Sequence, residues 1–369
     1  MVISGCAVLQ RVAEDIQQQG WSEAKMSSIE RRLERFVANK EVVVTDIWKA
    51  FLAQVLPYWK EQKLTFVLDC MPYNAQFTIV YLGLLVHSRV LPVAWVVMPQ
   101  QEPWQERQWD IVARLLETVR AVLPQTHCTL VADRGLAGLP LVRLCEQRHW
   151  HYVLRIWKAH TCRRQMGKST KWSPWCSFKS FIRKKGKPRY GRALVWQEET
   201  IETYVSACWE EEYQEAWLII SDLSAGKARI HTYALRMRVE STFQDTKTRG
   251  WNIEAAQLKQ RAHLDRLLLA LFLAVWWVIW RLPASITDSV TALIAMIDAT
   301  KASFVSDGSG SAIFCDAPPI LLPSRVVYPS RNRRMDGASR YDSKYTFRSQ
   351  KKCRGERGSL WNPFVYGVY

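Results

Sequence analysis

Residues 64–69 read Leu64-Thr-Phe-Val-Leu-Asp69, and residues 128–133 read Cys128-Thr-Leu-Val-Ala-Asp133. Both stretches are short apolar runs that end on an acid, a pattern typical of a buried strand whose last residue leaves the core. Two more apolar runs, Phe77–Val86 and Val90–Val97, flank His87-Ser88-Arg89 and predict a hairpin after the first strand.

The chain around these runs alternates between strand and helix patterns. Helices are predicted at residues 104–123 and 139–147, and further strands at 151–156 and 217–223. This order predicts a mixed α/β sheet whose first and fourth strands each end on an aspartate. Because sites form at the carboxyl ends of strands in such sheets, Asp69 and Asp133 are candidate functional residues. The alternative is that each is a solvated residue that begins a turn.

A third segment carries polar residues on one face of a predicted helix, which runs from Lys227 to about Gly250. At 100° per residue, Tyr233, Arg236, Glu240 and Lys247 fall within an arc of about 60°. Such a face is poorly suited to a core, but its cations suit phosphates and its carboxylate suits a metal ion. The alternative is an ordinary solvated face with an ion pair between Arg236 and Glu240.

The spacing Tyr-x2-Arg-x3-Glu-x6-Lys, from Tyr233 to Lys247, resembles the signature of bacterial insertion-sequence transposases of the IS-four group, a class of DDE cut-and-paste enzymes. Phe66-Val-Leu-Asp69 resembles the first catalytic strand of that family, and Leu130-Val-Ala-Asp133-Arg-Gly resembles the second. The similarity extends from about Arg31 to Leu282.

The resemblance implies a ribonuclease-H-like core in which Asp69, Asp133 and Glu240 bind two Mg²⁺ ions, with Mn²⁺ as a substitute. Two ions about 3.5–4 Å apart neutralise the attacking and leaving oxygens of phosphodiester transfer, and Mg²⁺ prefers carboxylate oxygens. The expected roles are Asp69 on both ions, Asp133 on one and Glu240 on the other. Water, and then a DNA 3′-hydroxyl, is the expected nucleophile. Phosphates of the transposon end are expected to be held by Tyr233, Arg236 and Lys247.

The positive charge of the chain is concentrated in one segment. The chain has 51 Lys and Arg against 34 Asp and Glu, a net charge of +17, and residues 155–192 hold 13 of the basic residues and no acid. Basic groups neutralise phosphates and aromatic rings stack on unpaired bases, so this segment is predicted to contact DNA near the cleaved end. Candidates for base stacking are Trp157, Trp172 and Trp175. The alternative is a solvated basic loop.

These patterns divide the chain into five regions. They are N-terminal helices at 1–60, a first core segment at 61–155, a β-rich basic insertion at 156–215, a second core segment with the Glu240 helix at 216–282, and a C-terminal region at 283–369. The first region either binds DNA ends or docks on the core. The last is interpreted as a dimerisation element, a disordered basic tail or a frame-shifted remnant of a decayed element.

Several other function classes find little support in the sequence. Nine scattered cysteines without a CxxC pair argue against a zinc module or disulfide framework and favour a reducing compartment. The apolar run Leu267–Trp280 is shorter than the roughly 18–20 residues that cross a bilayer, so it predicts a buried helix rather than a membrane span. No Gly-x4-Gly-Lys-Ser/Thr motif is present, so no nucleotide cofactor is expected.

The sequence therefore predicts a bacterial, cytoplasmic and nucleoid-associated DDE transposase. We expect it to bind the terminal inverted repeats of double-stranded DNA, as a homodimer on paired ends, and to cut and join strands. Two alternatives stay open. One is a nuclease of the same fold, which cleaves without end specificity or strand transfer, and the other is a catalytically silent DNA-binding protein derived from a transposase.

Overall fold

The computed structural model describes residues 1–279, except for residues 2, 3, 61, 87, 88, 124–126, 168, 169, 183, 212, 248 and 249 and the side chains of 278 and 279. The described residues all belong to one compact unit. Three predictions lie outside them: the C-terminal region at 283–369, the tip of the hairpin at 87–88, and the end of the last predicted helix beyond residue 279.

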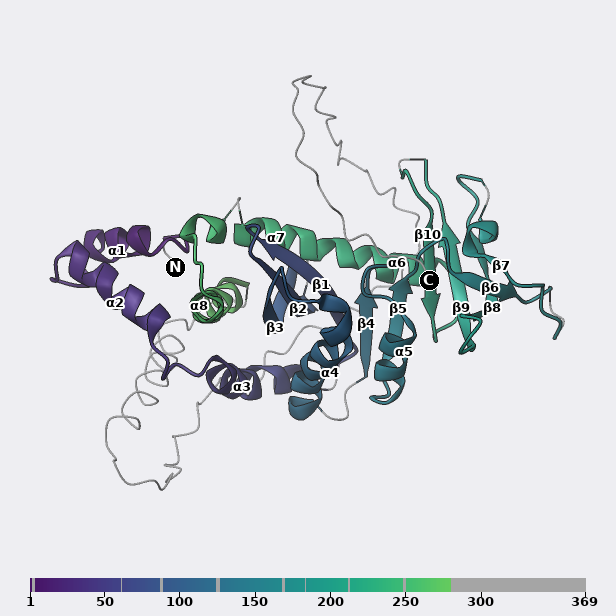
Figure 1. The fold of residues 1–369 in the computed structure, drawn as a ribbon, viewed down its shortest axis with the longest axis horizontal. Helices are drawn as coiled ribbons and strands as arrows, with labels where there is room; N and C mark the ends of the chain where they lie inside the picture. The colour runs from purple at the N-terminus through teal and green to yellow at the C-terminus, as the bar shows by residue number, and fades with distance from the viewer. Residues whose placement is uncertain are drawn as a thin grey trace, which may run out of the picture. The chain divides into compact units, whose positions relative to one another are not determined.

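Within the described part of the chain, ten strands form one mixed sheet (Figure 1). They are β1 (Leu64–Tyr73), β2 (Phe77–Val86), β3 (Arg89–Pro99), β4 (Cys128–Ala132), β5 (His151–Arg155), β6 (Thr161–Arg164), β7 (Cys176–Ser177), β8 (Arg189–Val195), β9 (Ile201–Cys208) and β10 (Trp217–Ser221). Their order is β3-β2-β1-β4-β5-β10-β9-β8-β6-β7. β1 runs parallel to β4, and β4 to β5, while the other neighbours are antiparallel. The predicted mixed α/β class is confirmed.

The pairing of β1 with β4 brings two acids together. Their parallel register ends at Leu68 opposite Ala132, so Asp69 and Asp133 are the next residues on two neighbouring segments. β4 ends at Ala132, one residue before the predicted end at Asp133. The prediction that Asp69 ends its strand is wrong, because residues 70–73 continue β1 by antiparallel pairing with β2.

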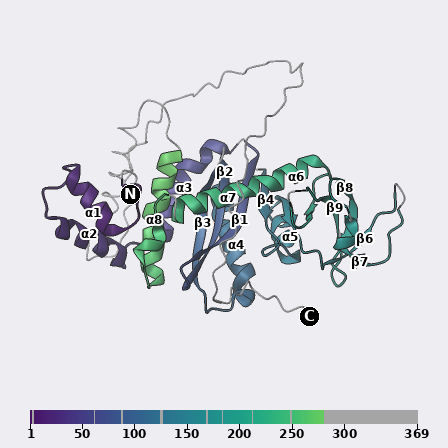
Figure 2. The same cartoon turned by 90° about the horizontal axis from the view of Figure 1, so that it is seen from above.

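Eight α-helices and four short 3-10 turns accompany the sheet in the described residues. The helices are α1 (Leu9–Gln18), α2 (Met26–Ala38), α3 (Val44–Val55), α4 (Trp104–Val122), α5 (Leu139–Glu146), α6 (Lys227–Ala234), α7 (Arg238–Lys247) and α8 (Arg261–Ile279), and the turns are η1 (Leu56–Trp59), η2 (Phe178–Phe181), η3 (Leu235–Met237) and η4 (Ile253–Ala256). The helix predicted from Lys227 onwards is thus two helices joined by η3. Figures 1 and 2 show α6 and α7 following one another across the strands, and α6 contacts β9, β10, β5 and β4 while α7 contacts β1 and β3.

A buried cluster holds α6 against the sheet. Val131, Val153 and Ile219 come from β4, β5 and β10, and they pack with Trp217 and with Tyr233 of α6. Tyr233 is 1% exposed. Burial of large apolar side chains contributes about 1.5–3 kcal/mol each, so rotation of α6 away from this cluster is costly. The position of the Tyr233 hydroxyl is therefore set by core packing.

The N-terminal helices pack on the core through α8. The contacts of α8 are with α2, α3 and β3. The guanidinium of Arg266 donates hydrogen bonds to the carbonyls of Val37 and Val42, and the indole N–H of Trp48 donates to the carbonyl of Val93 on β3 at 2.6 Å. Helices α2 and α3 are thus tied to α8 and β3 by hydrogen bonds as well as by packing. None of the described helices is long and apolar enough to span a membrane.

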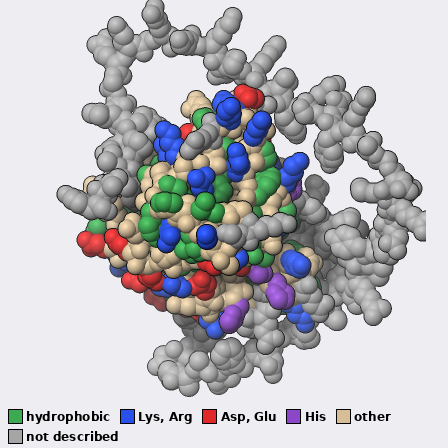
Figure 3. Space-filling view, turned by 90° about the vertical axis from the view of Figure 1, so that its right-hand side faces the viewer, with side chains coloured by type: hydrophobic (Ala, Val, Ile, Leu, Met, Phe, Trp, Pro, Cys, Tyr) green, Lys and Arg blue, Asp and Glu red, His purple; other side chains and the backbone are tan. Residues whose placement is uncertain are grey.

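Residues 156–215 extend the sheet rather than forming a separate layer. β9 pairs with β10, which itself pairs with β5, and β8, β6 and β7 follow outward. Figure 3 shows this end of the molecule, where Lys and Arg side chains spread over much of the surface while acidic side chains gather along one lower side. The strands of the basic segment therefore belong to the same hydrogen-bonded sheet as β1 and β4.

Candidate active site

Asp69 and Asp133 lie beside each other because of the strand register. Asp69 is 9% exposed, and its Oδ1 accepts a hydrogen bond of 2.8 Å from the backbone N–H of Cys70. The Asp133 side chain is more open, at 27% exposure. A buried carboxylate costs free energy unless a partner stabilises it, so the partners of these two acids matter.

The guanidinium of Arg236 is the common partner of three carboxylates. Its Nη2 donates to Asp69 Oδ2 at 2.7 Å and lies 4.0 Å from Asp133 Oδ2. Its Nη1 lies 3.5 Å from Oε1 of Glu240, four residues further along the helical segment. The Arg236 side chain is 11% exposed and sits in the 3-10 turn η3. Three acids that are distant in sequence thus surround one buried cation.

Two more side chains orient Asp133. The Tyr233 hydroxyl donates to Asp133 Oδ1 at 2.8 Å, and Arg155 Nη1 lies 3.6 Å from the same oxygen. The Tyr233 ring packs edge-on against Trp217, with 5.0 Å between ring centroids. The hydroxyl is held in place by an immobile ring, so the rotamer of Asp133 is fixed from one side.

The two aspartates have pKa values that shift in opposite directions. Burial raises the pKa of Asp69, and the nearby Arg236 opposes this effect without cancelling it. Burial also acts to raise the pKa of Asp133, but Arg236, the backbone N–H of Arg134 and the Tyr233 hydroxyl together outweigh it, so its pKa is lowered. Burial raises the pKa of Tyr233, which keeps its hydroxyl protonated as a donor. Paired titratable groups with diverging pKa values are characteristic of functional sites.

Lys247 is not part of this group. It shares a helix side with Arg236 but lies about three turns further on, or about 16 Å along the axis at 1.5 Å per residue. Its Nζ pairs with Glu254 Oε1 at 3.0 Å. The helical-wheel argument found the common side of Tyr233, Arg236, Glu240 and Lys247, but it carries no information on separation along the axis.

The three predicted stacking tryptophans all lie in the insertion. Trp157 is 37% exposed, and the guanidinium of Arg134 stacks over its ring at 4.1 Å from the centroid. Trp172 and Trp175 are half-buried. Trp157 is therefore linked to the paired acids through Arg134, the residue that follows Asp133.

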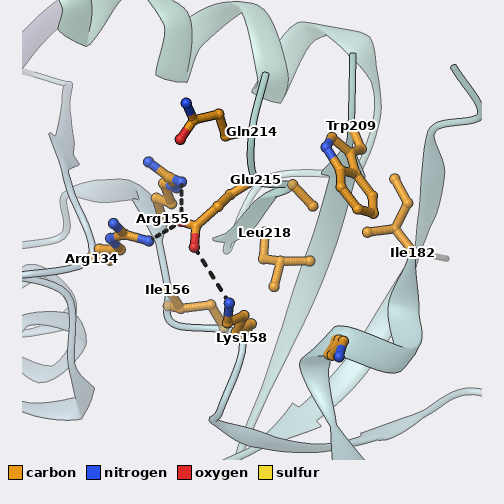
Figure 4. Close-up of a pocket in the computed structure, with 11 residues that line it drawn as sticks. Arg134, Arg155, Ile156, Lys158, Ile182, Trp209, Gln214, Glu215 and Leu218 are labelled. Carbon is orange, nitrogen blue, oxygen red and sulfur yellow. Dashed lines mark hydrogen bonds and ion pairs between the residues drawn. The ribbon is translucent and has the colours of Figure 1, made fainter. Parts of the chain in front are cut away.

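A second charged cluster adjoins the first. Glu215 lies before β10, and its carboxylate pairs with Arg134 and lies 3.6 Å from Arg155 Nη2 and 3.4 Å from Lys158 Nζ. These groups line a pocket together with Lys179 and with nonpolar atoms (Figure 4). Arg155 contacts both Asp133 and Glu215, so it connects the two clusters.

Sequence reasoning did not single out Arg134, Glu215 or Trp209, which also lines this pocket. One signal was available for Arg134, because it directly follows an aspartate already chosen as a candidate. For Glu215 the sequence shows only membership of an acidic run with Glu210 and Glu211. Its ion pairs with Arg134 after β4 and with Arg155 at the end of β5 depend on the order of the strands in the sheet, and local sequence patterns do not reveal that order.

The carboxylates do not form a ready-made metal site. Among the residues that the structure describes, no group of three or more His, Cys, Asp or Glu side chains is arranged to hold a metal ion. Asp69 Oδ2 and Asp133 Oδ2 both lie within 4.0 Å of Arg236 Nη2, so these two oxygens are less than about 7 Å apart. The donor set is all hard oxygen, which suits Mg²⁺, and at present it surrounds a guanidinium.

Comparison with known families identifies the class of protein to which this arrangement belongs. The family described as "Transposase DDE domain" matches residues 93–277, half of the chain. The chain therefore belongs to the DDE transposase family. No curated protein matches the sequence. The matched segment contains Asp133, Tyr233, Arg236 and Glu240 and begins after Asp69.

Family membership confirms the resemblance drawn from the sequence. It implies an enzyme that binds DNA and cleaves and transfers its strands, and DDE transposases use divalent metal ions, generally Mg²⁺. The excess of basic residues in the insertion, 13 Lys and Arg without an acid between residues 155 and 192, agrees with a DNA-binding enzyme.

Proposed function

We propose that the chain is a cut-and-paste transposase with a ribonuclease-H-like core, in which Asp69, Asp133 and Glu240 hold two Mg²⁺ ions, or Mn²⁺ in their place. The observation that carries this proposal is the convergence of the three acids on one guanidinium. The strand order β3-β2-β1-β4-β5, antiparallel in its first half and parallel in its second, supports the fold assignment.

The bound ions would supply Lewis-acid stabilisation of the oxygens that attack and leave during phosphodiester transfer. The residues of the chain contribute orientation and charge. Asp69 is held by the N–H of Cys70, and Asp133 is held by the Tyr233 hydroxyl, so both carboxylates are pre-oriented. Arg236 neutralises the acids before they are used and must withdraw for cations to take its place. Its long side chain then reaches a phosphate of the transposon end. Lys247, about three turns further along on the same helix side, binds another phosphate.

Substitution of the acids tests this proposal. Asp69→Asn, Asp133→Asn and Glu240→Gln should each abolish Mg²⁺-dependent nicking and strand transfer on DNA that carries the flanking inverted repeats, while end binding in a mobility-shift assay persists. Glu102→Gln is the matched control, because this acid pairs with Arg107 of α4 and neither residue has a role in the proposed site. Full nicking by any one of the three variants contradicts the assignment.

The same assay separates the two other functions considered for this fold. Cleavage of any duplex without strand transfer would identify a nuclease, and end binding by the unaltered chain without cleavage would identify a silent DNA-binding protein. We favour the transposase because the pairing of Asp69 and Asp133 with Arg236 is intact. A silent descendant has no functional reason to retain Asp69, Asp133 and Glu240 around one cation.

The insertion is proposed to hold DNA next to the cleaved end. Its support is the basic charge of residues 155–192 and the exposed Trp157 under Arg134. Single substitutions Trp157→Ala, Trp172→Ala and Trp175→Ala should weaken cleavage at the end if one of them stacks on a displaced base, at about 1–3 kcal/mol per stacked base. Unchanged cleavage by all three would refute stacking here. A homodimer on paired ends predicts synapsed complexes of two DNA ends in native gels.

A further inference from the structure

The cluster around Glu215 carries a function that the paired acids do not explain. Three cations from different segments converge on this one carboxylate: Arg134 after β4, Arg155 at the end of β5, and Lys158 in the loop that follows. Figure 4 shows the Glu215 side chain pointing between the two guanidinium groups on one side and the lysine ammonium on the other. Lys179 completes the basic lining of the pocket.

We propose that this pocket binds a backbone phosphate of DNA and that Glu215 occupies the place of the phosphate until DNA arrives. The proposal rests on the proposed function, since it places one more phosphate of the same DNA beside Asp133. It assigns Arg134, Arg155 and Lys158 as phosphate ligands and Glu215 as their internal competitor.

The charge balance of the pocket favours an anion. Three cations contact the carboxylate of Glu215, and Lys179 also lines the pocket. Arg155 contacts Asp133 as well. Guanidinium groups present a planar fork of donors that matches phosphate oxygens, and two of them already converge on one point. A phosphodiester there would replace one carboxylate with one phosphate of equal charge, so the exchange leaves no cation unpaired.

The two guanidinium groups are fixed by packing, whereas the Glu215 carboxylate is partly exposed to solvent. The Arg134 guanidinium is stacked on Trp157, and the Arg155 side chain is only 15% exposed. Glu215 is 41% exposed. The backbone beside it is anchored, because the Tyr213 ring stacks on Trp217 and the indole N–H of Trp209 donates to the Tyr213 carbonyl at 2.9 Å. Departure of Glu215 therefore requires a side-chain rotation into solvent and the exchange of its three ion pairs for those of the phosphate.

The position of the pocket suits a phosphate near the reacting strand. Arg155 Nη1 lies 3.6 Å from Asp133 Oδ1, and its Nη2 lies 3.6 Å from Glu215 Oε2. A phosphate bound in place of the Glu215 carboxylate would thus be separated from Asp133 by a single guanidinium.

The test is duplex binding by the full chain, measured by fluorescence anisotropy with a labelled mixed-sequence duplex over a series of NaCl concentrations. Glu215→Gln should bind about 3- to 10-fold more tightly than the unaltered chain, because one competing carboxylate is removed from three cations. Glu199→Gln is the matched control, since it changes the net charge equally but pairs with Arg143 on α5. The gain should shrink at high salt, where such interactions are screened.

A second variant keeps the proposal testable if Glu215→Gln is unstable. Lys158→Gln should weaken binding and reduce the slope of log affinity against log salt by about 0.9, as expected when one phosphate contact is lost. The pocket assignment would be overturned if the unaltered chain binds duplex, the Glu215 and Glu199 variants bind with equal affinity, and Lys158→Gln leaves the salt slope unchanged. The transposase proposal would then still stand. No binding or cleavage by the unaltered chain would instead overturn the proposed function.

Discussion

The position of Arg236 among three acids leads to a measurable prediction about stability. Its Nη2 contacts Asp69 Oδ2 at 2.7 Å, and the two side chains are 11% and 12% exposed, so this ion pair is largely shielded from water. Removing one partner of a buried pair leaves an uncompensated charge and costs about 3–5 kcal/mol. Glu240, at 49% exposure, adds little because solvent screens it.

The perturbation is Arg236→Gln, and the measurement is the thermal midpoint of the full chain without divalent metal. For a unit of this size the expected loss corresponds to a fall of about 5–8 °C. The double variant Asp69→Asn/Arg236→Gln is the control, because it removes the charge left behind. It should be more stable than Arg236→Gln alone, and the coupling between the two changes should be about 1–3 kcal/mol.

Magnesium supplies the second half of the test. In the unaltered chain a cation competes with Arg236, whereas in Arg236→Gln it does not. At a Mg²⁺ concentration ten times the dissociation constant, binding stabilises a protein by about 1.4 kcal/mol, or about 2 °C here. The rise in midpoint should therefore be larger in the variant. A midpoint within about 1 °C of the unaltered chain, or equal responses to Mg²⁺, would refute the reasoning.

Two further predictions concern the surrounding fold. A Cβ added at Gly83, where the register of β2 with β3 shifts, would lie 2.4 Å from Val90 Cγ1 and 2.8 Å from the Leu91 carbonyl oxygen. Gly83→Ala should therefore lower the free energy of unfolding, measured by urea denaturation, by about 1–3 kcal/mol, while Gly191→Ala should be tolerated. Burial raises the pKa of Asp265, so its contribution to stability is present below its unfolded pKa and is lost as pH rises through its folded pKa. Asp265→Asn should therefore gain thermal stability relative to the unaltered chain between pH 4 and pH 7. A difference in thermal midpoint that stays constant with pH would contradict this.

The parts of the fold that follow from local patterns were predictable. Alternation of apolar runs with turn residues gave β2 and β3, and helical spacing gave α4. The extent of β1 was not predictable from its own residues. Residues 70–73 include Pro72, which disfavours a strand interior, yet antiparallel pairing with β2 carries the strand through to Tyr73. Asp69, which the sequence placed at the end of a strand, therefore lies inside β1, and the residues on both sides of it are paired with β2.

At the site, too, the sequence indicated which residues take part but not which side chains they contact. The positions of Asp69 and Asp133 at the ends of apolar runs and the spacing from Tyr233 to Glu240 indicated residues that lie close together, because apolar runs and helix periodicity can be read locally. Neither property determines the direction of a long side chain. Arg236 faces three carboxylates, and its contact with Glu240 is the ion pair that the helix spacing also allowed, since buried charges are stable only beside a partner.

That balance has a consequence for how the site is used. Arg236 stands where cations are proposed to bind, and Glu215 stands where a phosphate is proposed to bind. Each ligand therefore has to compete with a side chain of the same charge sign, which lowers its apparent affinity but keeps the chain folded before either arrives. Arg155 contacts acids of both clusters, so if a bound cation took over the charge of Asp133, Arg155 would be available to the phosphate. Such an exchange couples the two ligands, and by reciprocity DNA must favour cation binding by the same factor.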